Sequence, residues 1–164
     1  MKMIDGNKNV KYRCVIISGF PGIGKSTAAE KSKYVIDAES SGYHYEFDYK
    51  TGEMIERDDW VQHYVDLIQH ESTQENYGLN YLLVSSHAEV RAEMIKRKIP
   101  FIFVVPDQRL KNEYMKRYLK RGSPVEFIKY MYDHWDSFFV GVANGSAPVI
   151  YLNSGEYLSD LIGV

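Results

Sequence analysis

The chain has 164 residues, of which 45% are hydrophobic and 26% charged, and its formal net charge at pH 7 is −2. These values are typical of one soluble globular domain, and the lack of a basic excess argues against a protein that grips a nucleic-acid backbone. The single cysteine, Cys14, excludes an internal disulfide framework and fits a reducing compartment. The apolar runs are too short to span a membrane, and residues 1–13 contain no apolar signal segment. We therefore expect a cytoplasmic protein without a membrane partner.

Five short apolar segments predict strands, and helical patterns lie between them. The segments at 14–18, 81–85, 101–105 and 149–152 are nearly continuous, and 34–37 is a weaker fifth, as in strands buried on both faces of a parallel sheet. Their alternation with helices predicts one α/β domain over 1–164, a three-layer sandwich with right-handed crossovers. The expected helices cover about 60–68, 87–98, 107–121 and the residues after Pro124. The segment 38–57 is either a hairpin turning at Thr51–Gly52 or an irregular substrate-side loop.

The segment Gly19–Ser26 (GFPGIGKS) fits the phosphate-binding pattern G-x-x-x-x-G-K-[ST]. It follows a predicted strand and opens a helical pattern at Lys25–Ser32, which is the context that this motif requires. Lys25 would reach the β- and γ-phosphates of a nucleotide, and the Ser26 hydroxyl would ligate Mg²⁺. We therefore expect ATP and Mg²⁺ to be bound by Gly19, Gly22, Ile23, Gly24, Lys25, Ser26 and Thr27.

The ends of the second and third predicted strands carry the next candidates, because ligands bind beyond the carboxyl ends of parallel strands. Asp37 would take the proton of an attacking hydroxyl or hold a metal-bound water, unless it is only a solvated turn residue. Ser85 stands where the Walker B strand of a motor or helicase-like ATPase would end in an aspartate. This departure argues against such an ATPase.

His87 and Arg91 follow the third predicted strand and are four residues apart, so they share one face of the next helix. Both can point at an anionic substrate. The alternatives are a structural role for His87 and a surface ion pair of Arg91 with Glu89 or Glu93.

The helix predicted at 107–121 carries six basic side chains between residues 109 and 121. At about 100° per residue, Arg117 and Arg121 fall within about 20° of the line of Leu110 and Tyr114. Two guanidinium groups on an inward-facing stripe are expensive without an anionic partner. We therefore expect a lid at about 115–126 whose arginines close over phosphates, the alternative being a solvated basic face.

With these residues the chain resembles P-loop kinases of the nucleoside monophosphate kinase type and the related shikimate- and gluconate-kinase-like enzymes. The segments VIDAESS, VSSHAEVR, RYLKRGS and WDSFF are, more narrowly, similar to small adenylate-kinase-like proteins of bacteriophages and prophages. The resemblance implies a P-loop NTPase fold with a five-stranded parallel sheet in the order 2-3-1-4-5. It also implies an acceptor-binding region at about 38–78, in which Trp60 is a possible stacking residue.

Carried over to this chain, the resemblance gives catalytic roles to Lys25, Asp37, Arg117 and Arg121. It gives substrate contacts to Asp37, Trp60 and Arg91, and an adenine contact to Asn153; His87 is a further substrate contact from its spacing to Arg91. The expected function is transfer of the γ-phosphoryl group of ATP to a nucleotide, a nucleoside or another small acceptor. The alternatives are a kinase for modified bases in phage DNA, which the acidic net charge disfavours, and a nucleotide-binding regulatory module without transfer.

Overall fold

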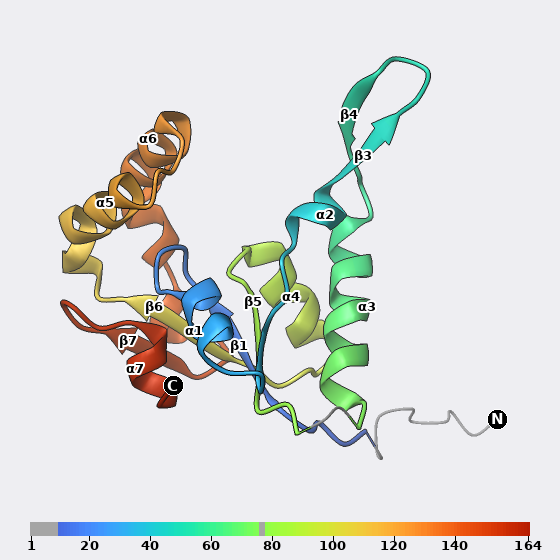
Figure 1. Cartoon of the computed structure of the whole chain (residues 1–164), viewed down its shortest axis with the longest axis horizontal. Coiled ribbons are helices and arrows are strands. Elements are labelled where there is room, and N and C mark those ends of the chain that lie inside the picture. Colours follow the sequence, from blue (N-terminus) through green and yellow to red (C-terminus); the bar gives the residue numbers. More distant parts are fainter. Residues whose placement is uncertain (1–9, 76–77) are drawn as a thin grey trace.

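The computed structural model describes residues 10–75 and 78–164. Part of the N-terminal segment assessed above as lacking a signal sequence, residues 1–9, lies outside this range. The central sheet has five parallel strands in the order β2-β5-β1-β6-β7 (Figure 1). These strands are Val15–Gly19 (β1), Val35–Asp37 (β2), Tyr81–Ser85 (β5), Ile102–Pro106 (β6) and Val149–Leu152 (β7).

The numbers in this order differ from the expected 2-3-1-4-5 because two strands that form a separate sheet, β3 and β4, come between β2 and β5. Taken alone in chain order, the five parallel strands lie in the order second, third, first, fourth, fifth. β1 therefore lies between β5 and β6, and the carboxyl ends of these three parallel strands lie at the same edge of the sheet.

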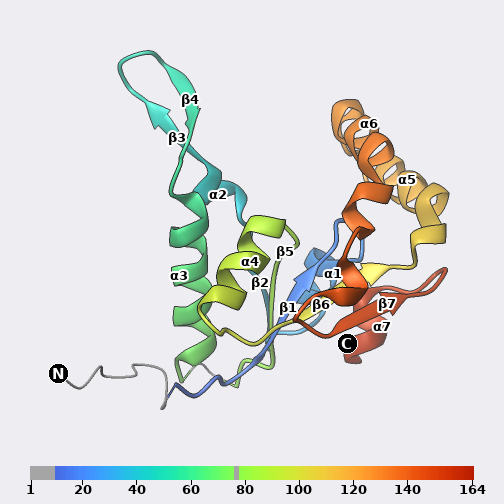
Figure 2. The same ribbon diagram turned by 180° about the vertical axis from the view of Figure 1, so that it is seen from behind.

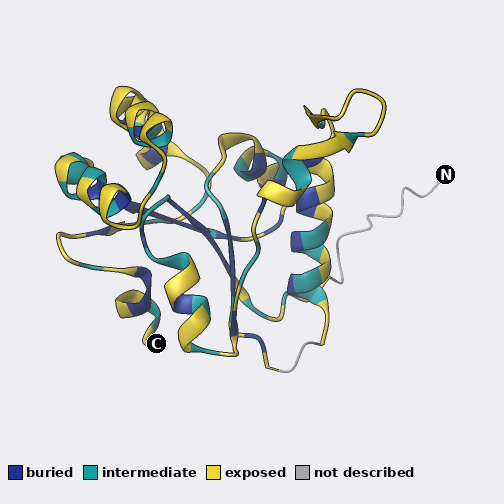
Figure 3. Cartoon of the chain, turned by 45° about the horizontal axis from the view of Figure 1, so that its top comes forward, coloured by how far each residue is buried: buried dark blue, intermediate teal, exposed yellow. Residues whose placement is uncertain are grey.

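Helices cover both faces of the sheet, as the α/β prediction required (Figures 1 and 2). Lys25–Lys31 (α1) and Leu158–Ile162 (α7) pack together on one face, and Trp60–Thr73 (α3) and Ala88–Lys96 (α4) pack together on the other. The strands of the central sheet are the most buried part of the chain (Figure 3). Their cores are almost fully inaccessible because apolar side chains point to both faces; examples are Ile16, Ile17, Leu82, Leu83, Val84 and Val104.

Two projections rise beyond the carboxyl edge of the sheet (Figures 1 and 2). The first contains the helices Lys111–Lys120 (α5) and Val125–His134 (α6), followed by short 3₁₀ turns at Asp136–Phe139 (η2) and Val142–Asn144 (η3). The helix expected at 107–121 instead begins with a 3₁₀ turn, Gln108–Leu110 (η1). The Asp107 side chain causes this start, because it accepts a hydrogen bond from the backbone N–H of Arg109.

The second projection lies in the segment for which the sequence left two alternatives. It consists of the short helix Ser41–His44 (α2) and an antiparallel hairpin of Tyr45–Asp48 (β3) and Glu53–Glu56 (β4). Gly52 allows the turn because its φ of 74° lies in the left-handed region. The hairpin alternative is therefore correct.

Among the residues that the structure describes, no helix is both long enough and apolar enough to cross a membrane.

Candidate functional site

The loop between β1 and α1 is held in a shape that needs glycine. Gly22 and Gly24 have φ values of 91° and 93°, and a Cβ placed on Gly22 would lie 2.8 Å from the ring of Tyr118. Ile23 is fully buried, and its carbonyl accepts a hydrogen bond of 2.8 Å from the N–H of Leu158. The expected phosphate-binding segment is thus a loop held by the buried Ile23 and its hydrogen bond with Leu158. The exposed first turn of α1, with Ser26 and Thr27, follows it.

Lys25 lies inside this loop. Its ammonium donates a hydrogen bond of 2.6 Å to the carbonyl oxygen of Gly19. Burial lowers the pKa of Lys25, while the carboxylates of Asp37 and Glu39 act in the opposite direction. A cation held in this way gains most from a ligand that brings negative charge next to it.

Beside the loop lies a cavity of about 270 Å³, which is lined by Lys25 and Asp37. Burial raises the pKa of the Asp37 carboxyl group, Glu39 raises it further, and Lys25 opposes both effects. The described lining holds nine polar side chains from four segments; besides Glu39, Ser40 and Ser86, these are Lys25, Ser26, Asp37, Ser85, His87 and Arg121, the six considered next. Each of these six except Ser85 was predicted as a site residue.

Ser85 lies at the end of β5, as expected from the sequence, but no role in the site was predicted for it. Its Oγ atom is buried and has no hydrogen-bond partner in the described part of the chain. The backbone N–H of Ser85 donates to the hydroxyl of Tyr64 (3.0 Å), which donates to the carbonyl of Ala38 (2.6 Å). Tyr64 therefore ties the ends of β5 and β2 together from the core, and burial raises its pKa to about 12. The unpaired hydroxyl of Ser85 is free to bind a water or a ligand oxygen.

His87 lies at the border of the cavity beside a second histidine. Desolvation is the main cause that lowers the pKa of His87, and His44, whose ring centre is 5.1 Å away, adds to it. A lowered pKa keeps His87 neutral at pH 7, so it offers a hydrogen bond rather than a charge. His44 in turn stacks on Trp60 with ring centres 3.5 Å apart. Trp60 is only 7% exposed and does not line the cavity.

Arg91 does not form the surface ion pair that was the alternative for it. Its Nε atom donates to the carbonyl of Ser86 (3.1 Å), and its guanidinium lies 4.0 Å from the ring centre of Phe103. The salt bridge of Glu93 goes to Arg97 instead. Within residues 10–75 and 78–164, no salt bridge joins Arg91 to a carboxylate. This half-buried cation lines a cavity that continues from the first.

Arg117 points inward as the helix angles predicted, but its partners belong to the protein. Its guanidinium donates to the carbonyl oxygens of Gly22 (3.0 Å) and Glu156 (2.9 Å) and to the carboxylate of Glu113 (3.0 Å). The guanidinium also lies against the rings of Tyr114 and Tyr157, at 4.4 and 4.0 Å. Arg117 is thus a link between α5, the phosphate loop and the loop after β7.

Arg121, one turn further along, is different. It follows the last turn of α5, is exposed, and donates a hydrogen bond of 2.8 Å to Ser123. Its side chain lines the cavity around Lys25 and also a larger one of about 580 Å³ on the other side of the loop. Of the two lid arginines that the sequence predicted, Arg121 alone borders both cavities.

The larger cavity lies where the resemblance placed the adenine. Gly155 and Tyr157 line it, whereas the expected contact, Asn153, lies outside the lining and donates its side-chain amide to Glu156 (3.0 Å). Sequence reasoning missed Tyr157, although it stands four residues after Asn153 in the same loop. Lys116 and Lys120 add positive charge to this cavity.

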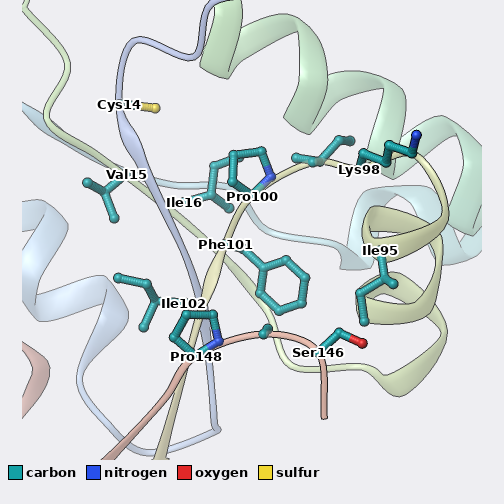
Figure 4. Close-up of a pocket in the computed structure, with 12 residues that line it drawn as sticks. Cys14, Val15, Ile16, Ile95, Lys98, Pro100, Phe101, Ile102, Ser146 and Pro148 are labelled. Atoms are coloured by element: carbon teal, nitrogen blue, oxygen red, sulfur yellow. The ribbon is translucent and has the colours of Figure 1, made fainter. Parts of the chain in front are cut away.

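Another cavity, of about 540 Å³, lies at the opposite, amino edge of the sheet (Figure 4). Its walls are mainly apolar, including Ile95 and Phe101, and Cys14 lies at one side. Burial raises the pKa of the Cys14 thiol, which disfavours the reactive thiolate. Lys98 is the one charged residue of the lining, which contains no carboxylate and no histidine. Its chemistry does not match that of the phosphate loop.

Two comparisons with known proteins complete this description. No protein-family model and no curated protein matches the chain.

Proposed function

We propose that this protein is a P-loop kinase that moves the γ-phosphoryl group of ATP to a nucleotide or nucleoside acceptor. The observation that carries the proposal is the placement of Lys25 and Asp37 in one cavity beside the loop Gly19–Ser26. Phosphoryl transfer to a hydroxyl or phosphate oxygen needs a cation and a base. Lys25, which has no salt bridge within residues 10–75 and 78–164, and the Asp37 carboxyl group with its raised pKa match these needs.

In this reaction the loop N–H groups and Lys25 hold the β- and γ-phosphates, and the base of ATP occupies the cavity lined by Tyr157. The acceptor oxygen attacks the γ-phosphorus, so that a new P–O bond forms while the bond to the β–γ bridging oxygen breaks. The electron pair of that bond leaves with ADP. A hydroxyl acceptor gives its proton to Asp37, and a phosphate acceptor that is already ionised needs no base. Lys25 and Arg121 stabilise the charge that develops on the oxygens.

Magnesium is part of this proposal, and the residues present fit it. The Ser26 hydroxyl would hold the ion, and Asp37 and the unpaired Oγ of Ser85 would hold water molecules around it. Among the described residues there is no cluster of three or more acidic, histidine or cysteine side chains that could hold a metal by itself. A site of this kind depends on the nucleotide phosphates, as is usual for Mg²⁺. When bound, the ion neutralises phosphate charge during the transfer.

The test is an ADP-release assay over nucleosides, nucleoside monophosphates and small polyols. We expect Lys25→Ala to lower turnover at least a hundredfold, the typical loss when one transition-state cation or donor is removed. Lys31→Ala is the matched control, because Lys31 is exposed at the other end of α1 and should keep full activity. Full turnover by Lys25→Ala would refute the proposal. ATP binding without turnover on every acceptor would instead favour the regulatory-module alternative.

A further inference from the structure

A cavity of about 440 Å³ continues from the one around Lys25 and lies between α4 and α6. The two cavities share four lining residues: Pro21, Ser86, His87 and Phe127. The second cavity therefore lies directly beside the first, with these four residues at the border between them. This adjacency puts the second cavity within reach of a molecule whose reacting oxygen lies near Asp37.

Five of the described residues that line this second cavity are phenylalanine or tyrosine. Phe20 and Phe138 meet edge to face with ring centres 5.8 Å apart, and Tyr130 lies 6.1 Å from Phe138. Tyr130 stacks on His134 with ring centres 4.3 Å apart, but it is 53% exposed, so the rest of its ring remains open to a ligand. Such a lining suits a flat, apolar ring better than a sugar or a polyol, whose hydroxyl groups would lose their hydration.

Arg91 adds a polar group with a planar face. Its guanidinium rests on Phe103 at 4.0 Å, and Ser86 accepts a hydrogen bond from Nε alone. Guanidinium groups stack on nucleobases and also donate hydrogen bonds to their edges. Glu89, which lines the same cavity, supplies an acceptor for an exocyclic amino group. The wall therefore offers both stacking and hydrogen bonding.

The aromatic surface of Trp60, which the resemblance implied as a possible stacking residue, is closed. His44 covers Trp60 with a ring separation of 3.5 Å, and Trp60 is 7% exposed. A base could stack on Trp60 only after His44 had moved away, whereas the cavity between α4 and α6 is open as it stands.

We infer that the acceptor carries a nucleobase and that this base binds between α4 and α6, against Arg91 and Tyr130, rather than on Trp60. The inference rests on the proposed kinase function and adds the place where the base of its acceptor binds. The ribose then lies next to Ser86 and His87, and the reacting oxygen lies at Asp37.

The experiment compares Tyr130→Ala with Tyr132→Ala. Both tyrosines are on α6 and both are 53% exposed, but Tyr132 does not line the cavity and packs with Lys111 instead. The acceptors are adenosine, cytidine and their 5′-monophosphates, with ribose 5-phosphate as a probe without a base. We expect Tyr130→Ala to raise the acceptor KM about tenfold, in the range for loss of one base–aromatic stack, with the KM for ATP unchanged. Tyr132→Ala should stay within about twofold of the wild type.

Arg91→Lys separates stacking from simple charge attraction. Lysine keeps the positive charge but has no planar group, so we expect the KM of base-containing acceptors to rise at least about fivefold. Efficient phosphorylation of ribose 5-phosphate, or equal KM values for the two tyrosine variants, would overturn the inference and leave the kinase function standing.

Failure of the kinase function gives a different result. If no acceptor is phosphorylated, calorimetric binding of the two monophosphates still tests the base site directly. Binding that Tyr130→Ala weakens and Tyr132→Ala preserves supports the site, and absence of binding to the wild-type protein overturns it.

Discussion

The two sides of the phosphate loop differ in how well their polar groups are satisfied. Toward α5, two carbonyls of the loop are paired within the protein: Tyr118 donates to the carbonyl of Pro21 (2.8 Å) and Arg117 to that of Gly22 (3.0 Å). Toward β2 and β5, Ser85 has an unpaired buried hydroxyl, and burial shifts the pKa values of Lys25 and Asp37 against their charged forms. One side is thus a rigid support, and the other holds groups that a ligand would satisfy.

From this difference we predict which substitutions should lower the stability of the fold and which should lower activity. Groups saturated by the protein contribute to folding, and their loss leaves unpaired partners. Groups that are desolvated without a full set of partners lower stability in exchange for binding and reactivity.

The largest effect on stability is expected from Arg117→Ala. The side chain of Arg117 is 9% exposed, and its removal leaves the carbonyls of Gly22 and Glu156 without their donor. Because hydrogen bonds from a charged group are strong, we expect a loss of about 3 kcal/mol in the free energy of unfolding, or roughly 6–12 °C in Tm. Thermal denaturation followed by circular dichroism measures it.

Arg121→Ala is the matched control for this prediction. Arg121 is exposed and its hydrogen bond goes to Ser123 only, so its removal should change the free energy of unfolding by less than about 0.5 kcal/mol. Turnover should nevertheless fall, because Arg121 borders both cavities. Equal melting temperatures for the two arginine variants would contradict the division into a supporting and a reactive side.

The second prediction concerns the reactive side. Asp37→Asn should lower turnover on a hydroxyl acceptor about a hundredfold, because the base is lost, and it should also raise Tm at pH 7. The raised pKa of Asp37 means that the folded state binds its proton more tightly than the unfolded state, so the ionised carboxylate costs stability above that pKa.

The pH dependence of this stability difference provides the control. As pH falls through the raised pKa toward the ordinary value for aspartate, the wild-type carboxyl becomes protonated and its cost disappears. The stability difference between Asp37→Asn and wild type should therefore shrink with decreasing pH. A variant that is less stable than the wild type at pH 7 would show that Asp37 supports the fold instead.

Arg117 also shows how much of the site could be predicted from the sequence. The phosphate loop, the five strands and the inward direction of Arg117 followed from local patterns of spacing and hydrophobicity. The partners of Arg117 did not, because Gly22 and Glu156 lie 95 and 39 residues away and meet it only in the folded chain. An inward arginine predicts an acceptor, but the sequence does not say whether that acceptor is a ligand or the backbone.

The cavity between α4 and α6 was missed for a related reason. Phe127, Met131 and Trp135 follow a helical stripe and indicate a buried core face. Met131 and Trp135 are indeed buried, but Phe127 is only partly covered, and Tyr130 beside this stripe lines an open cavity. Periodicity identifies which face of a helix is apolar, and it does not distinguish an apolar face packed on protein from one packed on a ligand.

The third prediction tests the supporting side with a single atom. Tyr118→Phe keeps the buried ring against Gly22 and removes the hydroxyl that donates to Pro21. We expect a loss of about 1 kcal/mol, or roughly 2–4 °C in Tm. Chemical denaturation gives the free energy directly. Tyr132→Phe on the exposed face of α6 is the control and should show no measurable change.

The smallest effect on stability is expected from the hairpin β3–β4, which projects beyond the carboxyl edge of the central sheet. Tyr49 at its tip is 92% exposed and Met54 is 61% exposed, and an isolated two-stranded hairpin contributes little stability by itself. Replacing residues 46–55 by a short Gly-Ser linker should therefore change the free energy of unfolding by less than about 0.5 kcal/mol. A large loss of stability would mean that the hairpin belongs to the supporting part of the molecule. An unchanged Tm with a raised acceptor KM would place it, like Asp37, among the parts whose contribution appears only when a ligand binds.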